Sequence, residues 1–222
     1  MTRGQNTRGQ NNRGRLIAIE GIDGAGKSTQ AQLLADGLGA IHTFQFGATP
    51  VGALLRDILL DPANVNLDDK TELLLILADK AQHVSEIVEP ALNGGTHVVV
   101  DRFGASTLAY QGYGRGLDLD VLAKMTLFST GGLEPDITIL LDIDLDMRSK
   151  RLGDNLDRLE QAEVACDSGP ESGADTFISQ VRNGYLELAA ADPERWIVVD
   201  ASGNSADIAA TVLQHVKDRL SL

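Results

Sequence analysis

One short stretch restricts the fold of this chain more than any other feature. Residues Gly21 to Ser28 read GIDGAGKS and match the pattern G-x-x-x-x-G-K-[ST]. The stretch directly follows the apolar run Leu16 to Glu20 and opens a helical pattern, so a strand, a tight loop and a helix are expected in succession. Such a loop surrounds phosphate oxygens with main-chain N–H groups at a helix amino terminus. We therefore expect the chain to bind a nucleoside triphosphate.

Short apolar runs alternate with helical patterns along the whole chain, as in parallel sheets that are covered on both faces. The expected strands are Leu16 to Glu20, Ile41 to Phe46, His97 to Asp101, Ile137 to Asp142 and Trp196 to Asp200. The expected helices are Lys27 to Leu38, Val51 to Leu60, Asp69 to Leu92, Leu119 to Ser129, Asp144 to Leu152, Thr176 to Ala190 and Ala206 to Leu220. This order predicts an α/β fold: a three-layer sandwich of the P-loop NTPase type, with a five-stranded parallel sheet flanked by helices.

Two polar segments fall outside these elements. Residues 1–14 repeat Arg, Gly, Gln and Asn with almost nothing to bury, which predicts a disordered tail, with a weak RNA-binding or phosphate-binding arm as the alternative. Residues 160–175 are rich in small and polar residues and predict a flexible loop. A single domain is therefore expected over residues 15–222.

The composition narrows the ligands and the compartment. The formal net charge of −13 disfavours a nucleic-acid partner and favours a small anionic ligand. The lone Cys166 rules out an internal disulfide framework, which suits a reducing compartment, and no apolar run is long enough to cross a bilayer. A cytoplasmic protein without a membrane partner is expected.

Charged residues after two strands extend the phosphate loop into a larger site. In the loop, Lys27 provides a point charge and the Ser28 hydroxyl can hold Mg²⁺. Asp101 and Arg102 end the third strand beside it, where Asp101 can act on the Mg²⁺ shell and Arg102 on a second phosphate, although a surface ion pair is the alternative. Residues 146–160 predict an arginine-rich lid, with a solvated helix as the alternative, and carry Arg148, Lys150, Arg151 and Arg158.

The sequence also carries no Asn-Lys-x-Asp motif for reading guanine, so ATP is the expected donor. With these residues in place, the chain resembles the thymidylate kinase family, bacterial type, from Leu16 onward. The matching pieces are EGIDGAGKST at 20–29, LR at 55–56, ADKAQH at 78–83, DRF at 101–103, AYQ at 109–111, GLEPD at 132–136, LDRLE at 156–160 and YLELA at 185–189.

The resemblance implies a nucleoside-monophosphate kinase that converts dTMP to dTDP with ATP and Mg²⁺, as a homodimer. It implies a phosphate cradle for ATP made by Gly21, Asp23, Gly24, Gly26, Lys27, Ser28 and Thr29, with Ser28 and Asp101 at the metal. It implies that Lys27, Arg102, Arg151 and Arg158 stabilise the transferring phosphoryl group. The acceptor nucleotide is expected at Asp23, Arg56, Ile76, Lys80, Arg102, Thr107, Tyr110 and Gln111, with Arg56 and Arg102 on its phosphate and Tyr110 rejecting a 2′-hydroxyl.

Three positions depart from the family pattern. Bacterial members read Arg-Glu-Pro-Gly-Gly-Thr where this chain reads FQFGAT at 44–49, so one basic phosphate contact is missing. Ile76 replaces a phenylalanine that stacks on thymine, and Lys80 replaces an arginine that reads its O4 atom. Lysine lacks the planar fork of arginine, so weaker discrimination between bases is expected. Ile76 keeps apolar contact but loses the ring-specific interaction, unless Phe44 or Phe46 enters the pocket instead of lying in the core.

Other kinds of P-loop protein stay open at this level. A kinase of altered nucleotide specificity fits the departures, and an ATPase or regulatory switch acting on a protein partner fits the missing basic residue. A kinase that acts on a nucleoside conflicts with Arg56 and Arg102, which would then face no acceptor charge.

Overall fold

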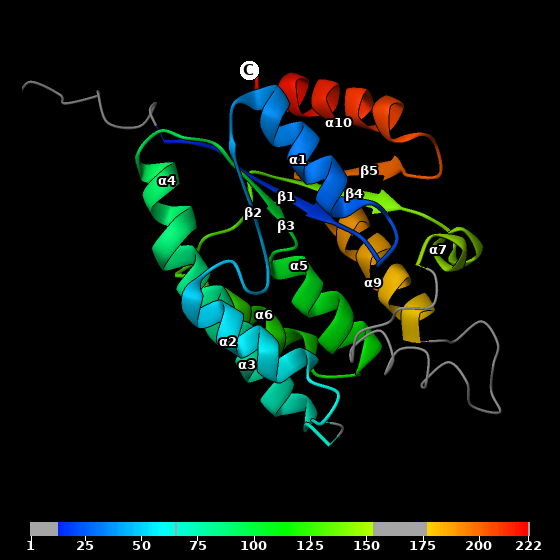
Figure 1. The fold of residues 1–222 in the computed structure, drawn as a ribbon. Coiled ribbons are helices and arrows are strands. Elements are labelled where there is room, and N and C mark those ends of the chain that lie inside the picture. The colour runs from blue at the N-terminus through cyan, green and yellow to red at the C-terminus, as the bar shows by residue number, and fades with distance from the viewer. Residues whose placement is uncertain (1–12, 65, 153–176, 222) are drawn as a thin grey trace, which may run out of the picture.

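The protein forms an α/β sandwich around one parallel sheet, shown here as a computed structural model that describes residues 13–64, 66–152 and 177–221 (Figure 1). The strands are β1 (Leu16–Glu20), β2 (Ile41–Phe44), β3 (Val98–Asp101), β4 (Ile137–Asp142) and β5 (Trp196–Asp200). They are all parallel and lie in the order β2-β3-β1-β4-β5. The predicted five-stranded parallel sheet is confirmed, although β2 ends two residues earlier than expected.

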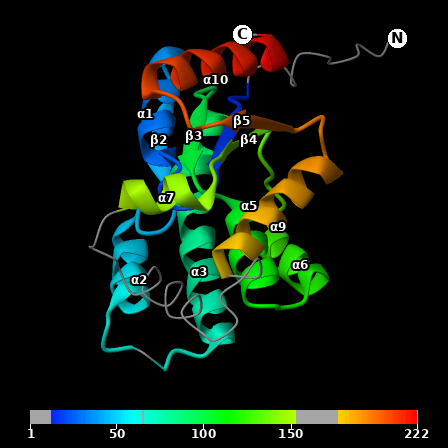
Figure 2. The ribbon, with the colours of Figure 1, turned by 90° about the vertical axis from the view of Figure 1, so that its right-hand side faces the viewer.

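Helices cover both faces of the sheet, as the continuous apolar strands require. On one face lie α1 (Lys27–Leu38) and α10 (Ser205–Leu220), and on the other lie α4 (Glu89–Asn93) and α9 (Phe177–Ala191) (Figures 1 and 2). Every residue of β1 and β3 is buried between these layers. The carboxyl ends of these two strands therefore open onto the same edge, where the sequence placed the site.

Further helices follow the strands. They are α2 (Pro50–Leu60), α3 (Asp69–His83), α6 (Leu119–Ser129) and α7 (Leu145–Leu152). Two of them, α2 and α3, contribute residues to the pocket beside the cradle. A π-helical segment, η1 (Val84–Val88), joins α3 to α4, so the single long helix predicted from Asp69 is confirmed. Side-chain oxygens cap the first turns of four helices, which satisfies otherwise unpaired N–H groups; these caps are Thr49, Asp68, Asp118 and Asn204.

Within the part of the chain that the structure describes, one helix was not predicted from the sequence. It comprises α5 (Gly104–Thr107) and the π-helical segment η2 (Leu108–Gly114), directly after β3. Its three glycines lower the local helix propensity. Each glycine sits where another helix packs closely: a Cβ atom at Gly112 would lie 2.4 Å from Leu119, and one at Gly114 would lie 2.5 Å from Phe177. Packing against α6 and α9 therefore overrides local propensity.

Some expectations concern residues that the structure does not describe. The predicted flexible loop at 160–175, the second half of the lid, Arg158 and Cys166 lie outside the described residues, as do residues 1–12 of the expected tail. Gly14, which was assigned to the tail, is buried, and its N–H donates to the Leu92 carbonyl at 2.8 Å. The folded domain therefore begins before residue 15. No helix within the described part of the chain is long and apolar enough to cross a membrane.

Candidate active site

The phosphate cradle, residues Gly21 to Ser28, is built as its sequence predicts. It leaves the end of β1 and enters α1, whose amino terminus faces the loop. Gly26 has φ 89°, and Gly21 has φ 141° with its Cβ position 2.5 Å from the Leu141 carbonyl. Side chains at these points would be strained or would collide with the backbone. The glycines therefore allow the loop to turn tightly with its amides near the space for phosphates.

Lys27 lies inside this loop and is almost fully buried. Its Nζ donates to the Ile22 carbonyl at 3.0 Å and to Asp23 Oδ1 at 3.2 Å. Burial, with the nearby charge of Arg102, lowers the pKa of Lys27 below its usual value, although Asp23 and Asp101 oppose the shift. Among the described residues these two oxygens are its hydrogen-bond acceptors, and an ammonium carries three donors, so one donor remains for an anion.

Ser28 and Asp101 meet where the sequence placed a metal. The Ser28 hydroxyl donates to Asp101 Oδ2 at 2.5 Å. The other carboxylate oxygen of Asp101 is buried and has no hydrogen-bond partner among the described residues. An unpaired buried carboxylate oxygen beside a hydroxyl fits the chemistry of a Mg²⁺ ligand set, in which one or two carboxylates are completed by phosphates and water.

Arg102 connects the cradle to the neighbouring pocket. It follows β3 in a left-handed conformation with φ 66°, and its main-chain N–H donates to the Ile19 carbonyl. Its guanidinium contacts Asp23 Oδ1 at 2.6 Å and the Tyr110 hydroxyl at 3.1 Å. Burial would raise the pKa of Asp23, but the charges of Arg102 and Lys27 outweigh it and hold this pKa well below its usual range. Asp23 is thus a fixed anion between two cations.

A buried glutamate that sequence reasoning did not single out organises the same region. Glu20, the last residue of β1, accepts hydrogen bonds from the Phe103 N–H at 2.8 Å, the Ser106 hydroxyl at 2.5 Å and the Tyr185 hydroxyl at 3.1 Å. Ser106 and Tyr185 each also contact Arg102. Glu20 therefore links β1, α5 and α9 around the arginine. Its position at the end of a predicted strand, directly before the cradle, was the sequence feature that could have identified it.

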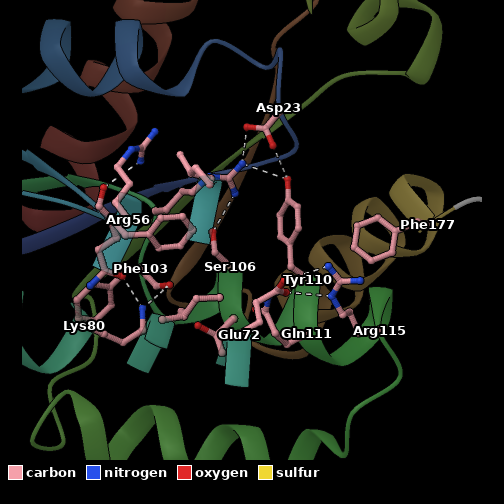
Figure 3. A pocket seen from close by; sticks show the side chains of 16 residues that line it. Asp23, Arg56, Glu72, Lys80, Phe103, Ser106, Tyr110, Gln111, Arg115 and Phe177 are labelled. Carbon is pink, nitrogen blue, oxygen red and sulfur yellow. Dashed lines mark hydrogen bonds and ion pairs between the residues drawn. The ribbon is translucent and has the colours of Figure 1, made fainter. Parts of the chain in front are cut away.

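A single pocket gathers all eight residues that were expected to bind the acceptor nucleotide: Asp23, Arg56, Ile76, Lys80, Arg102, Thr107, Tyr110 and Gln111 (Figure 3). They come from the cradle, α2, α3, the end of β3 and the unpredicted helix 104–114. The pocket also contains Phe46, which the sequence left open between core and pocket, and seven residues that were not expected to bind the nucleotide: Gln45, Leu60, Glu72, Phe103, Ser106, Arg115 and Phe177.

The two ends of this pocket differ in chemistry. At one end, Arg102 contacts Asp23 of the cradle. Arg56 lies on the same side of the pocket and donates to the Phe46 carbonyl at 3.0 Å (Figure 3). The opposite end is formed by Glu72, Gln111 and other residues of α3 and η2. The cationic end suits a phosphate group, and the far end, rich in hydrogen-bonding groups, suits a base.

Tyr110 and Thr107 reach the pocket from the helix 104–114. The Tyr110 hydroxyl donates to Asp23 Oδ2 at 3.0 Å, and its ring packs edge-on against Phe177 and Tyr185. Thr107 is buried, and its hydroxyl has no hydrogen-bond partner among the described residues. A buried hydroxyl that lines a pocket without a protein partner is suited to bind a ligand.

Arg151, the remaining described residue of the predicted catalytic set, lies on α7 across the cradle. Its guanidinium donates to the Gly24 carbonyl at 3.2 Å and to the Ala201 carbonyl at 2.9 Å. It is not among the residues found to line the pocket. The structure therefore places Arg151 against the cradle.

Comparisons with known proteins agree with this geometry. The thymidylate kinase family model matches residues 19–212. The chain is 41% identical over 202 residues to the thymidylate kinase of Desulfosudis oleivorans, covering 89% of this chain and 94% of that protein. It is 42% identical to the thymidylate kinase of Deinococcus radiodurans, covering 93% and 98% of the two chains. The crystal structure of thymidylate kinase from Ehrlichia chaffeensis matches with a TM-score of 0.73 and 28% identity, over 92% and 99% of the chains.

The chain belongs to the thymidylate kinase family. Family membership makes it a nucleoside-monophosphate kinase and removes the ATPase and switch alternatives. The predicted resemblance and fold class are both confirmed.

The residues that differ from the family pattern can now be located in the structure. Ile76 and Lys80 both line the pocket, as does Phe46, whereas Phe44 is an exposed residue of β2. Neither phenylalanine is therefore a core residue. Lys80 is fully buried, with its Nζ donating to Gln45 Oε1 and to the Phe103 carbonyl, and burial lowers its pKa to about 8. Its ammonium is thus held by protein acceptors.

A buried chain of hydrogen bonds continues from Lys80 to β2. Because Gln45 Oε1 accepts from Lys80, its amide nitrogen donates to His83 Nδ1 at 3.2 Å, and His83 Nε2 then donates to the Thr43 hydroxyl at 2.7 Å. This order requires a neutral His83. Burial, aided by the charge of Lys80, lowers the pKa of His83 to about 4.

Because His83 is neutral in the folded protein, we expect the free energy of unfolding to decrease in acid. The unfolded chain takes up a proton near pH 6.5, whereas the folded chain resists it down to about pH 4. Lowering the pH through this window therefore removes about 3 kcal/mol of the free energy of unfolding. We expect His83→Gln to reduce this pH dependence in urea unfolding between pH 7 and 4. The exposed His215→Gln is the control, and equal slopes for both variants would contradict the role of His83.

Proposed function

We propose that this kinase transfers the terminal phosphoryl group of ATP to dTMP and releases dTDP and ADP. The observation that carries the proposal is Arg102, which lies between the cradle and the acceptor pocket and is held there by Asp23. Two nucleotides bound on either side of it would meet end to end with their phosphates toward the same arginine. The family names of the relatives support thymine as the acceptor base.

The side chains divide into groups with different tasks. Lys27 and the cradle glycines hold the ATP phosphates, while Arg56 and Arg102 hold the acceptor phosphate. Phosphoryl transfer needs mainly alignment and neutralisation of charge on the migrating group, which Lys27 and Arg102 supply from opposite sides. Arg151 adds positive charge from the donor side, and Arg158, outside the described residues, stays a prediction for the same task.

The part of the pocket where Tyr110 meets Asp23, beside the phosphate end, suits a deoxyribose. Asp23 is positioned to accept a hydrogen bond from the sugar 3′-hydroxyl, and the Tyr110 ring occupies the space beside it. An additional 2′-hydroxyl would lie against this ring and lose its hydration. Thr107 and Gln111 lie farther along, where they can contact the base.

We propose Mg²⁺ as the metal cofactor, held by Ser28 and Asp101 together with ATP phosphates. The pair of oxygens described above, one of them buried and unpartnered within the described residues, supports this assignment. Bound Mg²⁺ would neutralise phosphate charge during transfer. Thr29 follows Ser28 in the first turn of α1 and completes the cradle.

The reaction is tested by measuring ADP production with dTMP, dUMP, dCMP, UMP and thymidine as acceptors, each with and without Mg²⁺. We expect turnover that requires a monophosphate and Mg²⁺, with dTMP preferred and UMP poor. Identification of dTDP by chromatography checks the product. ADP release that is independent of every acceptor would contradict a kinase, and activity with thymidine alone would indicate a nucleoside kinase.

We also propose a homodimer, formed through α3 and α6. Apolar side chains are exposed there on neighbouring helices: Phe128 on α6 is 89% exposed and Leu74 on α3 is 56% exposed. We expect sedimentation to give twice the mass of the chain for the wild type and the mass of one chain for Phe128→Asp. Leu33→Asp, an exposed apolar position on α1, is the control and stays dimeric. A monomeric wild type would refute this arrangement.

A further inference from the structure

The base end of the pocket contains a carboxylate that the proposed reaction has not used. Glu72 lies in the first turn of α3 and is 1% exposed. A buried carboxylate is costly unless it is paired and hydrogen-bonded. Glu72 is paired by Arg115, whose Nε and Nη2 lie 3.0 Å and 3.1 Å from its two oxygens. The pairing explains why the charge is tolerated, but not why it lines the pocket.

The same carboxylate also contacts Gln111. The amide nitrogen of Gln111 donates to Glu72 Oε1 at 3.2 Å, across from η2 to α3 (Figure 3). An ionised carboxylate has only acceptors, so it must face the NH₂ group of the amide and never its oxygen. This fixes the rotation of the Gln111 amide by chemistry alone.

The orientation of Gln111 decides what it presents to a ligand. With its nitrogen committed to Glu72, its oxygen remains, and that oxygen accepts no hydrogen bond within the described parts of the chain. Gln111 thus offers an acceptor to the pocket. Thymine and uracil carry an N–H donor at N3, whereas cytosine carries an acceptor at the same atom. The Gln111 oxygen would therefore bind thymine and uracil at N3 and repel cytosine.

We infer that Glu72, held by Arg115, is a positioning residue for base selection: it fixes the Gln111 amide so that its oxygen selects bases with a donor at N3. This inference deepens the proposed function and rests on it. It also provides discrimination that does not depend on Ile76 or on Lys80, whose ammonium is directed to Gln45 and to the Phe103 carbonyl. The selectivity expected to weaken at those two positions is maintained at another wall of the pocket.

The test is the ratio of kcat/KM for dTMP to kcat/KM for dCMP in Glu72→Gln. A glutamine at 72 can donate as well as accept, so the Gln111 amide is free to turn and present its nitrogen. We expect this ratio to fall by about 10-fold or more, the value of one hydrogen bond gained by one base and lost by the other. A ratio of two substrates in one preparation does not depend on how much of the variant is folded.

A second variant distinguishes positioning from mere support of the fold. In the double variant Glu72→Gln with Gln111→Glu, residue 111 is a carboxylate that accepts from residue 72 and still presents an acceptor to the base. We expect the ratio to recover toward that of the wild type. Asp69→Asn removes another carboxylate, 3.4 Å from Arg115 and half-exposed, without touching Gln111, and we expect it to leave the ratio unchanged.

The outcomes separate this inference from the proposed reaction. If the wild type does not phosphorylate dTMP at all, the proposed function fails. If the wild type does so, but Glu72→Gln keeps the same ratio, or the double variant fails to restore it, the positioning role of Glu72 is overturned.

Discussion

Replacing Arg102 by alanine is expected to lower kcat/KM for dTMP by about 10³-fold or more, because this guanidinium stabilises charge on the transferring phosphoryl group. The side chain is nearly buried, and burial would lower its pKa, but the charge of Asp23, with that of Asp101, keeps the pKa well above its ordinary value, so it is always charged. Its orientation is fixed by contacts with Asp23, Ser106, Tyr110 and Tyr185.

The conservative variant Arg102→Lys gives the matched comparison. Lysine keeps the charge but lacks the planar fork that reaches several partners at once, so an intermediate loss is expected. ATP affinity, measured by titration with a fluorescent analogue, should change little, because Lys27 and the cradle amides remain. A loss confined to ATP affinity, with normal turnover of dTMP, would show that Arg102 does not serve the acceptor.

Replacing Lys27 by methionine is expected to lower kcat by about 10³-fold, because the ammonium that neutralises the donor phosphates is removed. Methionine keeps most of the volume of the side chain, so the cradle should keep its shape. The pKa of Lys27 is lowered chiefly by burial, which shows that the charged form is held against a desolvation cost in the folded protein without nucleotide.

Although Lys27→Met is expected to lower activity, we do not expect it to lower stability. Removing a buried charge relieves its desolvation cost, and Asp23 keeps its partner Arg102, so the midpoint of thermal unfolding should be equal to or higher than that of the wild type. Lys124→Met, at an exposed position on α6, is the control for both measurements. A large drop in the unfolding midpoint of Lys27→Met would mean that the lysine supports the fold rather than the reaction.

The departures from the family pattern take on a different meaning in three dimensions. Lys80, Gln45 and His83 form one buried hydrogen-bonded chain, so Lys80 cannot be judged as an isolated loss of an arginine. Phe46 places an aromatic ring in the same pocket as Ile76. The sequence alone could not decide between a core position and a pocket position for Phe46, because both are apolar environments.

Local patterns in the sequence were sufficient to predict the strands of the sheet and the phosphate cradle. Apolar runs predicted all five strands, and the glycine pattern predicted the cradle with its strand before and its helix after. The neighbourhood of Asp101 and the cradle followed as well, since parallel strands end on the same edge of a sheet. These features depend on periodicity and on backbone conformation, which short stretches of sequence encode directly.

Tertiary structure decided the helix 104–114 and the contacts of its side chains. Its glycines read locally as breaks, yet they allow close packing against residues of α6 and α9. Glu72 and Gln111 are 39 positions apart, and only the fold brings the carboxylate on α3 within hydrogen-bonding distance of the amide on η2. Such contacts depend on complementary surfaces of elements distant in sequence, and neither residue type nor periodicity records which surfaces will meet.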